Sequence, residues 1–211
     1  RVDVEREVSE VVIYTHDHPG VFAQIAGAMS LTNATILDAR ISTLAHGMAL
    51  DTFWIQDITG GPFMKKERLK RLKERIKDAL NGKLRPSKEL QKVRDQTMLN
   101  RTRVFKVPPR VLIDNTVSAK YTVIEVNGRD RLGFLNDATE ALTGMGLQIA
   151  SAHISTYGER VVDVFYVKDV FGLRVEHEGK IIQIKRALLE AIEPTTSAQG
   201  DKIAKKVSNN L

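Results

Sequence analysis

Two four-residue segments of the chain carry residues that could hold a small zwitterion. Residues 17–20 read Asp-His-Pro-Gly and residues 130–133 read Asp-Arg-Leu-Gly, and an apolar helical pattern follows each of them. Glycine lets a backbone approach a ligand closely, and the unpaired amides and positive dipole end of a helix favour a carboxylate. The aspartate could accept hydrogen bonds from an ammonium group. The segments therefore suit a free amino acid, although an Asp-x-x-Gly turn can also simply cap its helix.

Both segments belong to an internal repeat. Residues 17–43 align with residues 130–156 at an offset of 113, and each stretch ends in Ile-Ser-Thr. After one residue is dropped in a turn, residues 51–60 align with residues 163–172 at an offset of 112. The chain is therefore predicted to contain two copies of one structural unit.

Each copy has the same predicted order of elements. Apolar, β-branched runs at residues 11–14 and 121–126 predict a first strand. The turn and a first helix follow, then two strands around a tight turn, and finally a second helix over residues 65–80 or 178–192. The predicted buried positions of the first helices are Phe22, Ile25 and Met29 in one copy and Leu135, Ala138 and Leu142 in the other.

This order predicts an α+β protein with two ferredoxin-like βαββαβ domains, each an antiparallel sheet with helices on one face. We place the first domain at residues 10–82 and the second at residues 119–193. A last strand of the first domain is expected within residues 103–115, with the Pro108-Pro109 pair at a bend or an edge. Because a single copy would leave an open sheet edge, we expect the copies to pair through sheets or edges.

The connecting and terminal segments are less apolar. Residues 83–118 form the expected linker, with a short helix around residues 87–99, and residues 194–211 are expected to be a flexible polar tail. The chain begins with Arg1 and has no signal-like start, which suggests a piece of a longer chain. It has no cysteine and no apolar run near the ~20 residues that cross a bilayer, and we expect a cytoplasmic protein.

Catalytic signatures are scarce in this sequence. Phosphate-binding loops, dinucleotide fingerprints, serine elbows and zinc-binding helix motifs are all missing. The His16-Asp17 pair resembles part of a metal site, but it leads into a turn and the five histidines are scattered. Asp51 and Asp163 occupy matching mid-strand positions, where a structural hydrogen bond is a better explanation than acid catalysis. We therefore expect no catalytic residue, no metal site and no cofactor in this chain.

The net charge of +6 is concentrated in one segment. Residues 65–78 contain eight basic and three acidic side chains, a local net charge of +5. Apolar residues recur there at helical spacing, which favours a helix with a solvated charged face. A nucleic-acid surface is the alternative, but interleaved aromatic residues are missing from it.

Several stretches resemble a known family. The turn, the helix after it, residues 33–36 and the strand pair resemble the ACT domain, a regulatory module that binds amino acids, in both copies. Four longer stretches resemble the C-terminal part of the bifunctional enzymes that uridylylate and deuridylylate the nitrogen-regulatory PII protein. These stretches are residues 15–30, 49–57, 110–135 and 159–169.

This resemblance implies a tandem sensor that binds glutamine and controls the catalytic domains of a parent enzyme. The implied partners are glutamine, those catalytic domains, the PII protein acting through the parent enzyme, and other ACT domains. The parent enzyme would be expected to use magnesium outside this chain. Two alternatives stay open: a ligand-free dimerisation or interaction module, and a basic module that binds nucleic acid.

The resemblance also implies which residues contact the ligand. In this family the ligand contacts the turn before the first helix and the start of the next strand, usually between two copies. Two residues depart from the usual Asp-Arg-Pro-Gly turn, His18 and Leu132, and Thr35 and Gln148 stand where asparagine is common. The implied contacts are Asp17, His18, Gly20, Val21, Phe22, Thr35 and Ile36 in the first copy, and Asp130, Arg131, Gly133, Phe134, Leu135, Gln148 and Ile149 in the second.

Overall fold

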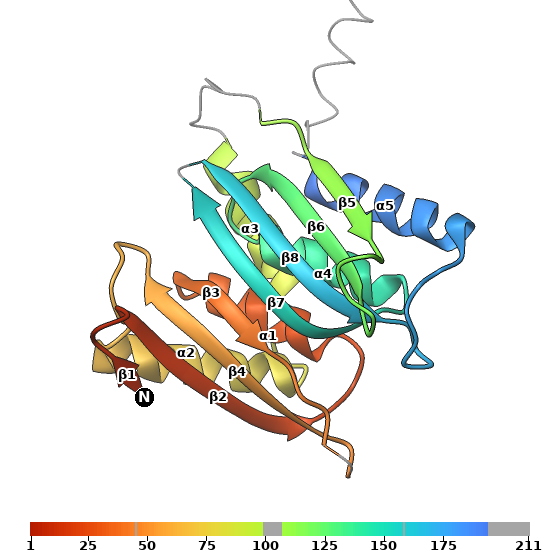
Figure 1. The fold of residues 1–211 in the computed structure, drawn as a ribbon. Coiled ribbons are helices and arrows are strands. Elements are labelled where there is room, and N and C mark those ends of the chain that lie inside the picture. Colours follow the sequence, from red (N-terminus) through yellow and green to blue (C-terminus); the bar gives the residue numbers. More distant parts are fainter. Residues whose placement is uncertain (45, 99–106, 158, 194–211) are drawn as a thin grey trace, which may run out of the picture.

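A computed structural model describes residues 1–44, 46–98, 107–157 and 159–193. It contains one eight-stranded antiparallel sheet in the order β1-β2-β4-β3-β7-β8-β6-β5, with helices on one face (Figure 1). The strands are β1 (Val2–Asp3), β2 (Val8–His16), β3 (Ala34–Arg40), β4 (Met48–Asp57), β5 (Arg110–Asp114), β6 (Thr122–Arg129), β7 (Gln148–Tyr157) and β8 (Arg160–Lys168). The helices are α1 (Val21–Ser30), α2 (Lys66–Leu80), α3 (Pro86–Met98), α4 (Phe134–Gly144) and α5 (Glu178–Ile192).

The repeat is confirmed as two units of the same order, β2-α1-β3-β4-α2 and β6-α4-β7-β8-α5. Alternate residues of the central strands point toward the helices and form the core, as Phe53 and Phe165 do. The predicted stripe of α1 is buried. In α4, Ala138 and Leu142 are buried as predicted, whereas Leu135 is half-buried and its neighbour Phe134 takes the core position.

The two units join edge to edge through β3 and β7. Ala39 lies opposite Ala152, and these two alanines occupy equivalent positions of the repeat. Beneath the sheet, the Asn136 side chain donates a hydrogen bond to the carbonyl of Ala23 at 3.0 Å, and these two positions are also equivalent. The copies are therefore related by an approximate two-fold axis within one chain, which confirms the predicted pairing of edges.

The last strand expected for the first copy lies elsewhere. β5 pairs antiparallel with β6, so it extends the second copy at the far edge of the sheet. The outer edge of the first copy is instead covered by the short strand β1, which pairs with β2. Residues 103–106 of the expected range lie outside the described residues, as does the predicted tail at residues 194–211. The second copy thus receives the fourth strand that we had expected in the first.

The predicted linker helix is confirmed as α3. It packs against α1 where a glycine allows close approach: a Cβ atom added to Gly27 would lie 2.5 Å from Cβ of Pro86 and 2.8 Å from Nδ2 of Asn136. Gly27 therefore lies where α1, α3 and α4 meet.

This close approach makes a prediction about stability. We expect Gly27→Ala to lower the free energy of unfolding by about 1–3 kcal/mol through overpacking, which outweighs the ~1 kcal/mol of helix propensity that alanine adds. Urea denaturation followed by circular dichroism would measure the change. Gly144→Ala is the matched control, because an added Cβ there meets no atom within 4 Å. A Gly27→Ala protein as stable as the control would contradict the packing of α3 against α1.

Candidate ligand-binding site

The two Asp-x-x-Gly turns immediately precede α1 and α4. Gly20 and Gly133 have left-handed φ angles of 89° and 79° and stand at the helix N-caps without any side-chain capping bond. The Asp17 carboxylate instead accepts a hydrogen bond from the Thr43 hydroxyl at 2.6 Å. The first amide of each helix donates to a carbonyl of its own turn, Val21 to His18 at 3.2 Å and Phe134 to Arg131 at 3.0 Å, and the next amides have no partner within the helix. Helix capping by the turn aspartates is therefore wrong, and the turns keep the features that suit a ligand.

The first turn lies against the second copy. A Cβ atom added to Gly20 would lie 3.7 Å from Cγ2 of Thr143, at the end of α4. The end of β3 is next to this turn through the bond between Thr43 and Asp17. The amide of Ile41 donates to the carbonyl of Ala150, near the start of β7, at 3.1 Å. Thr143 of the second copy and Thr43 of the first thus lie beside the first turn.

This geometry regroups the predicted site residues. β3 runs back along α1, so its start lies about 15 Å, the length of the ten-residue helix, from the first turn. Thr35 and Ile36 are therefore not beside Gly20, as we had expected, but on the side of the second turn. The start of β7, which contains Gln148 and Ile149, lies on the side of the first turn. A prediction that groups the residues of each copy separately could not anticipate this arrangement, because it ignores the antiparallel pairing of β3 with β7.

The side chains of the predicted set differ in exposure. Asp17, His18, Asp130 and Gln148 are exposed, and Arg131, Leu135, Thr35 and Ile149 are half-buried. Those of Val21, Phe22, Ile36 and Phe134 belong to the core. Because the side chains of this last group lie in the core, these residues can contact a ligand only through their backbone atoms.

The second turn is covered by α3. A Cβ atom added to Gly133 would lie 3.1 Å from Cδ1 of Leu90 and 3.2 Å from Nη1 of Arg94. Gly133 is buried, whereas Gly20 in the first turn is half-buried and Asp17 and His18 beside it are exposed. The two turns are therefore alike in backbone but not in access.

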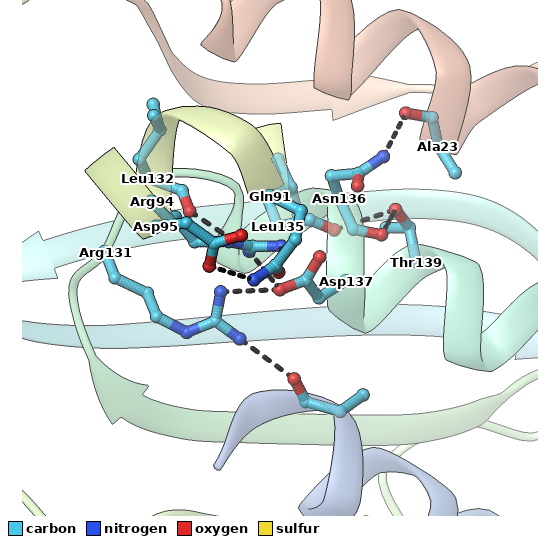
Figure 2. Close-up of polar contacts among 11 residues, drawn as sticks. Ala23, Gln91, Arg94, Asp95, Arg131, Leu132, Leu135, Asn136, Asp137 and Thr139 are labelled. Atoms are coloured by element: carbon cyan, nitrogen blue, oxygen red, sulfur yellow. Dashed lines mark hydrogen bonds and ion pairs between the residues drawn. The ribbon is translucent and has the colours of Figure 1, made fainter. Parts of the chain in front are cut away.

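Three charged residues, the Arg94–Asp137–Arg131 cluster, hold the second turn in place (Figure 2). The Asp137 carboxylate accepts from Arg94 at 2.6 Å and from Arg131 at 2.5 Å. Arg94 also donates to the carbonyl of Leu132 at 3.3 Å, and Arg131 donates to the carbonyl of Ala191 in α5 at 2.9 Å. The cluster thus joins the second turn to α3, α4 and α5. Sequence reasoning missed Arg94, since the linker gave no sign of where it would pack.

The first turn has a different set of residues at these positions. The repeat places His18 at the position of Arg131 and Gln24 at the position of Asp137. Nδ1 of His18 lies 3.1 Å from the carbonyl oxygen of Pro19. The Oε1 atom of Gln24 is buried and has no hydrogen-bond partner among the described residues. The first turn therefore lacks an ionic cluster of this kind. A comparison of the two repeats at positions 24 and 137 could have revealed the difference.

Two buried carboxyl groups occupy matching positions on β4 and β8. Asp51 and Asp163 are 1% and 0% exposed on the helix-covered side of the sheet. Neither oxygen of Asp163 has a hydrogen-bond partner of normal geometry among the described residues. Burial raises the pKa of Asp51 to about 6 and the pKa of Asp163 well above its usual range. The backbone of Ser42 lowers the pKa of Asp51 in part, and the backbone of Ser155 does the same for Asp163, whereas the aspartate of the nearby turn raises each value. The expected structural hydrogen bond is thus incomplete.

Other kinds of site find little support. No three histidine, aspartate or glutamate side chains gather to hold a metal ion within the described ranges. Across the same ranges, no helix combines the length and apolar character needed to cross a bilayer. On the basic helix α2, Arg68 is engaged in an ion pair with Asp57 and donates to the carbonyls of Thr32 and Asn33, both at 3.2 Å.

The two copies share one order of elements and one kind of turn before their first helix. Residues 117–195 match the family model described as the ACR family N-terminal ACT domain, so the second copy is an ACT domain.

The chain is 54% identical over 193 residues to the bifunctional uridylyltransferase/uridylyl-removing enzyme of Azospirillum brasilense, and 52% identical over 193 residues to that of Rhodospirillum rubrum. These matches cover 91% and 92% of this chain but only 21% and 20% of the two enzymes. Among solved structures, the regulatory subunit of aspartate kinase from Thermus thermophilus aligns with 88% of this chain and 99% of its own at 12% identity and a TM-score of 0.25, too low to add to the fold described above.

The raised pKa of Asp51 predicts a pH-dependent loss of stability. The unfolded carboxyl ionises near pH 4 and the folded one near pH 6. The free energy of unfolding should therefore fall between these values as pH rises, by about 3 kcal/mol at 1.36 kcal/mol per pKa unit. Asp51→Asn should remove this contribution and so reduce the slope in denaturation curves recorded from pH 4 to pH 8, whereas the contribution of Asp163 remains.

Asp114→Asn is a control of opposite sign for this measurement. Hydrogen bonds from Thr116 lower the pKa of the exposed Asp114 carboxyl. Its contribution to stability is present at neutral pH and is lost as pH falls through its folded pKa. An Asp51→Asn protein with the same pH dependence as the unsubstituted chain would contradict the assignment.

Proposed function

We propose that this chain is a regulatory module that binds free glutamine at its first turn, residues 17–22. In this proposal the bound amino acid controls the uridylylation and deuridylylation of the PII nitrogen-regulatory protein by catalytic domains of a longer cytoplasmic enzyme. The observation that carries the proposal is the open first turn, which has residues of both copies around it. The names of the most similar proteins support the catalytic context, and the chain spans about a fifth of their length.

The chemistry of the first turn fits an amino acid backbone. The N-terminal amides of α1 and its positive dipole end suit the α-carboxylate. Asp17 is exposed, and its carboxylate has one bond, from Thr43, which leaves acceptor capacity for an α-ammonium group. Gln148 is exposed at the start of β7, on the same side of the sheet junction as this turn, and can exchange amide hydrogen bonds with a carboxamide side chain.

The position of this turn also suits signalling. A ligand there would contact α1 and the second copy together, and so would bind one arrangement of the copies more tightly than another. Only such a difference in affinity can shift the population of arrangements. The β3–β7 pairing and the crossing of α1 with α4 would carry this shift between the copies.

A second candidate function is a ligand-free association module. The sheet face opposite the helices exposes apolar side chains at Val12, Tyr14 and Leu50, and Tyr14 pairs with Leu50 across β2 and β4. Static light scattering with and without glutamine separates the two functions. A mass that depends on concentration, with no glutamine binding, would favour association. A nucleic-acid surface on α2 gains no comparable observation.

The proposed site predicts a specific loss of binding. In isothermal titration we expect glutamine to bind the unsubstituted chain, and Gly20→Val to weaken binding at least tenfold. Valine is strained at a φ of 89° and would crowd Thr143. Glutamate should bind more weakly than glutamine, because its carboxylate replaces the carboxamide.

Gly60→Val is the matched control, since Gly60 has a similar φ of 81° but no atom within 4 Å of an added Cβ. Its binding should equal that of the unsubstituted chain. A folded, unsubstituted chain that takes up no glutamine at millimolar concentration would overturn the proposed function.

A further inference from the structure

The two turns differ in what covers them, and only the second is in contact with α3. α3 follows α2 of the first copy and, among the described residues, no helix takes the same place at the first turn. Leu90 of α3 is fully buried. Its Cδ1 atom and Nη1 of Arg94 are within 3.2 Å of the place that a Cβ on Gly133 would take. An element of the chain itself therefore lies directly against Gly133 of the second turn.

We propose that α3 is an internal ligand of the second turn, and that α3 and a free amino acid exclude each other there. This inference rests on the proposed function, in which such a turn binds an amino acid. Leu90 fills the apolar space beside Gly133, and Arg94 provides the positive charge. The second turn then becomes a latent amino-acid site that opens when α3 leaves.

The contacts of Arg94 show which group of the amino acid would replace it. Its guanidinium donates to the carbonyl of Leu132 and to the carboxylate of Asp137 (Figure 2). An α-ammonium group has the same charge and also carries N–H donors, so it can use the same two acceptors. The repeat places the Pro19 carbonyl and Gln24 at the equivalent positions of the first turn. There, Oε1 of Gln24 is buried and has no partner in the described part of the chain.

The docked state of α3 leaves polar groups unsatisfied. The Nε atoms of Arg94 and Arg131 are both buried, and neither has a hydrogen-bond partner within the described ranges. Both side chains are largely withdrawn from water, with exposed fractions of 12% and 20%. A buried donor without a partner destabilises the arrangement that creates it. Undocking of α3 would return the Nε donor of Arg94 to water, so the contact is suited to competition with a ligand.

Release of α3 would reach both copies. α3 follows α2 of the first copy, precedes β5 of the second, and packs against Gly27 of α1. Because the two occupants exclude each other, an amino acid bound at the second turn displaces α3. By the same linkage, weaker docking of α3 raises the affinity for the amino acid. The docking of α3 thus depends on the concentration of the amino acid.

The test uses Arg94→Met in the complete 211-residue chain. This variant keeps the apolar stem and removes the charge and the donors. We expect the amides of α3 to exchange hydrogen for deuterium at least tenfold faster than in the unsubstituted chain. We also expect isothermal titration to change from one to two glutamine molecules per chain. Lys92→Met is the matched control, because Lys92 lies on the same helix, has 67% of its side chain exposed and pairs with Glu89 of that helix.

Arg94→Lys provides a second variant in case Arg94→Met does not fold, and should show an intermediate increase in exchange. Unchanged exchange of α3 in a folded Arg94 variant would overturn the docking role. Faster exchange with one glutamine still bound would overturn the competition alone. Glutamine binding to neither protein would overturn the proposed function and the competition with it, whereas the exchange of α3 would still decide whether the cluster holds this helix.

Discussion

Antiparallel pairing of β3 with β7 converts two smaller sheets, each with an open edge, into one sheet of eight strands. An open strand edge invites pairing with other chains, and the internal junction removes two such edges. Ala39 and Ala152 meet at its centre, and directly below them α1 crosses α4 through the bond from Asn136 to Ala23. Because the junction is antiparallel, it brings the turn of one copy to the strand start of the other. The location of the candidate site follows from this single contact.

Two copies of one unit need not keep the same role, and the described residues of the two copies differ at their turns. α3 packs beside the second turn. The side chains around each turn agree with this difference. Arg131 and Asp137 form a charged cluster with Arg94, whereas His18 and Gln24 occupy those positions in the first copy. The charged cluster suits a helix that carries an arginine, and the described residues show no such helix against the first turn.

The buried carboxyl groups of Asp51 and Asp163 lie near the same turns in both copies. Each loses hydration without a full replacement by hydrogen bonds, and the aspartate of the neighbouring turn adds repulsion. Ionisable groups with strongly raised pKa values are common near functional sites, because binding or catalysis often needs a desolvated charge. Their recurrence in both copies links them to the turns rather than to a local feature of one strand. The unsatisfied polar groups of this chain thus gather around its two candidate sites.

Local sequence determined the units of this protein. β-branched runs, helical spacing and the repeat predicted the β-α-β-β-α order of each copy, and the pattern over residues 178–192 predicted α5 with the observed bounds. These features depend on neighbouring residues, so a sequence can reveal them. Only the tertiary structure decided that β5 joins β6, that Thr35 lies away from Gly20, and that α3 covers Gly133. The partner of a strand depends on which edges are free, and the seat of a linker helix depends on surfaces far apart in sequence, so neither is written in a local pattern.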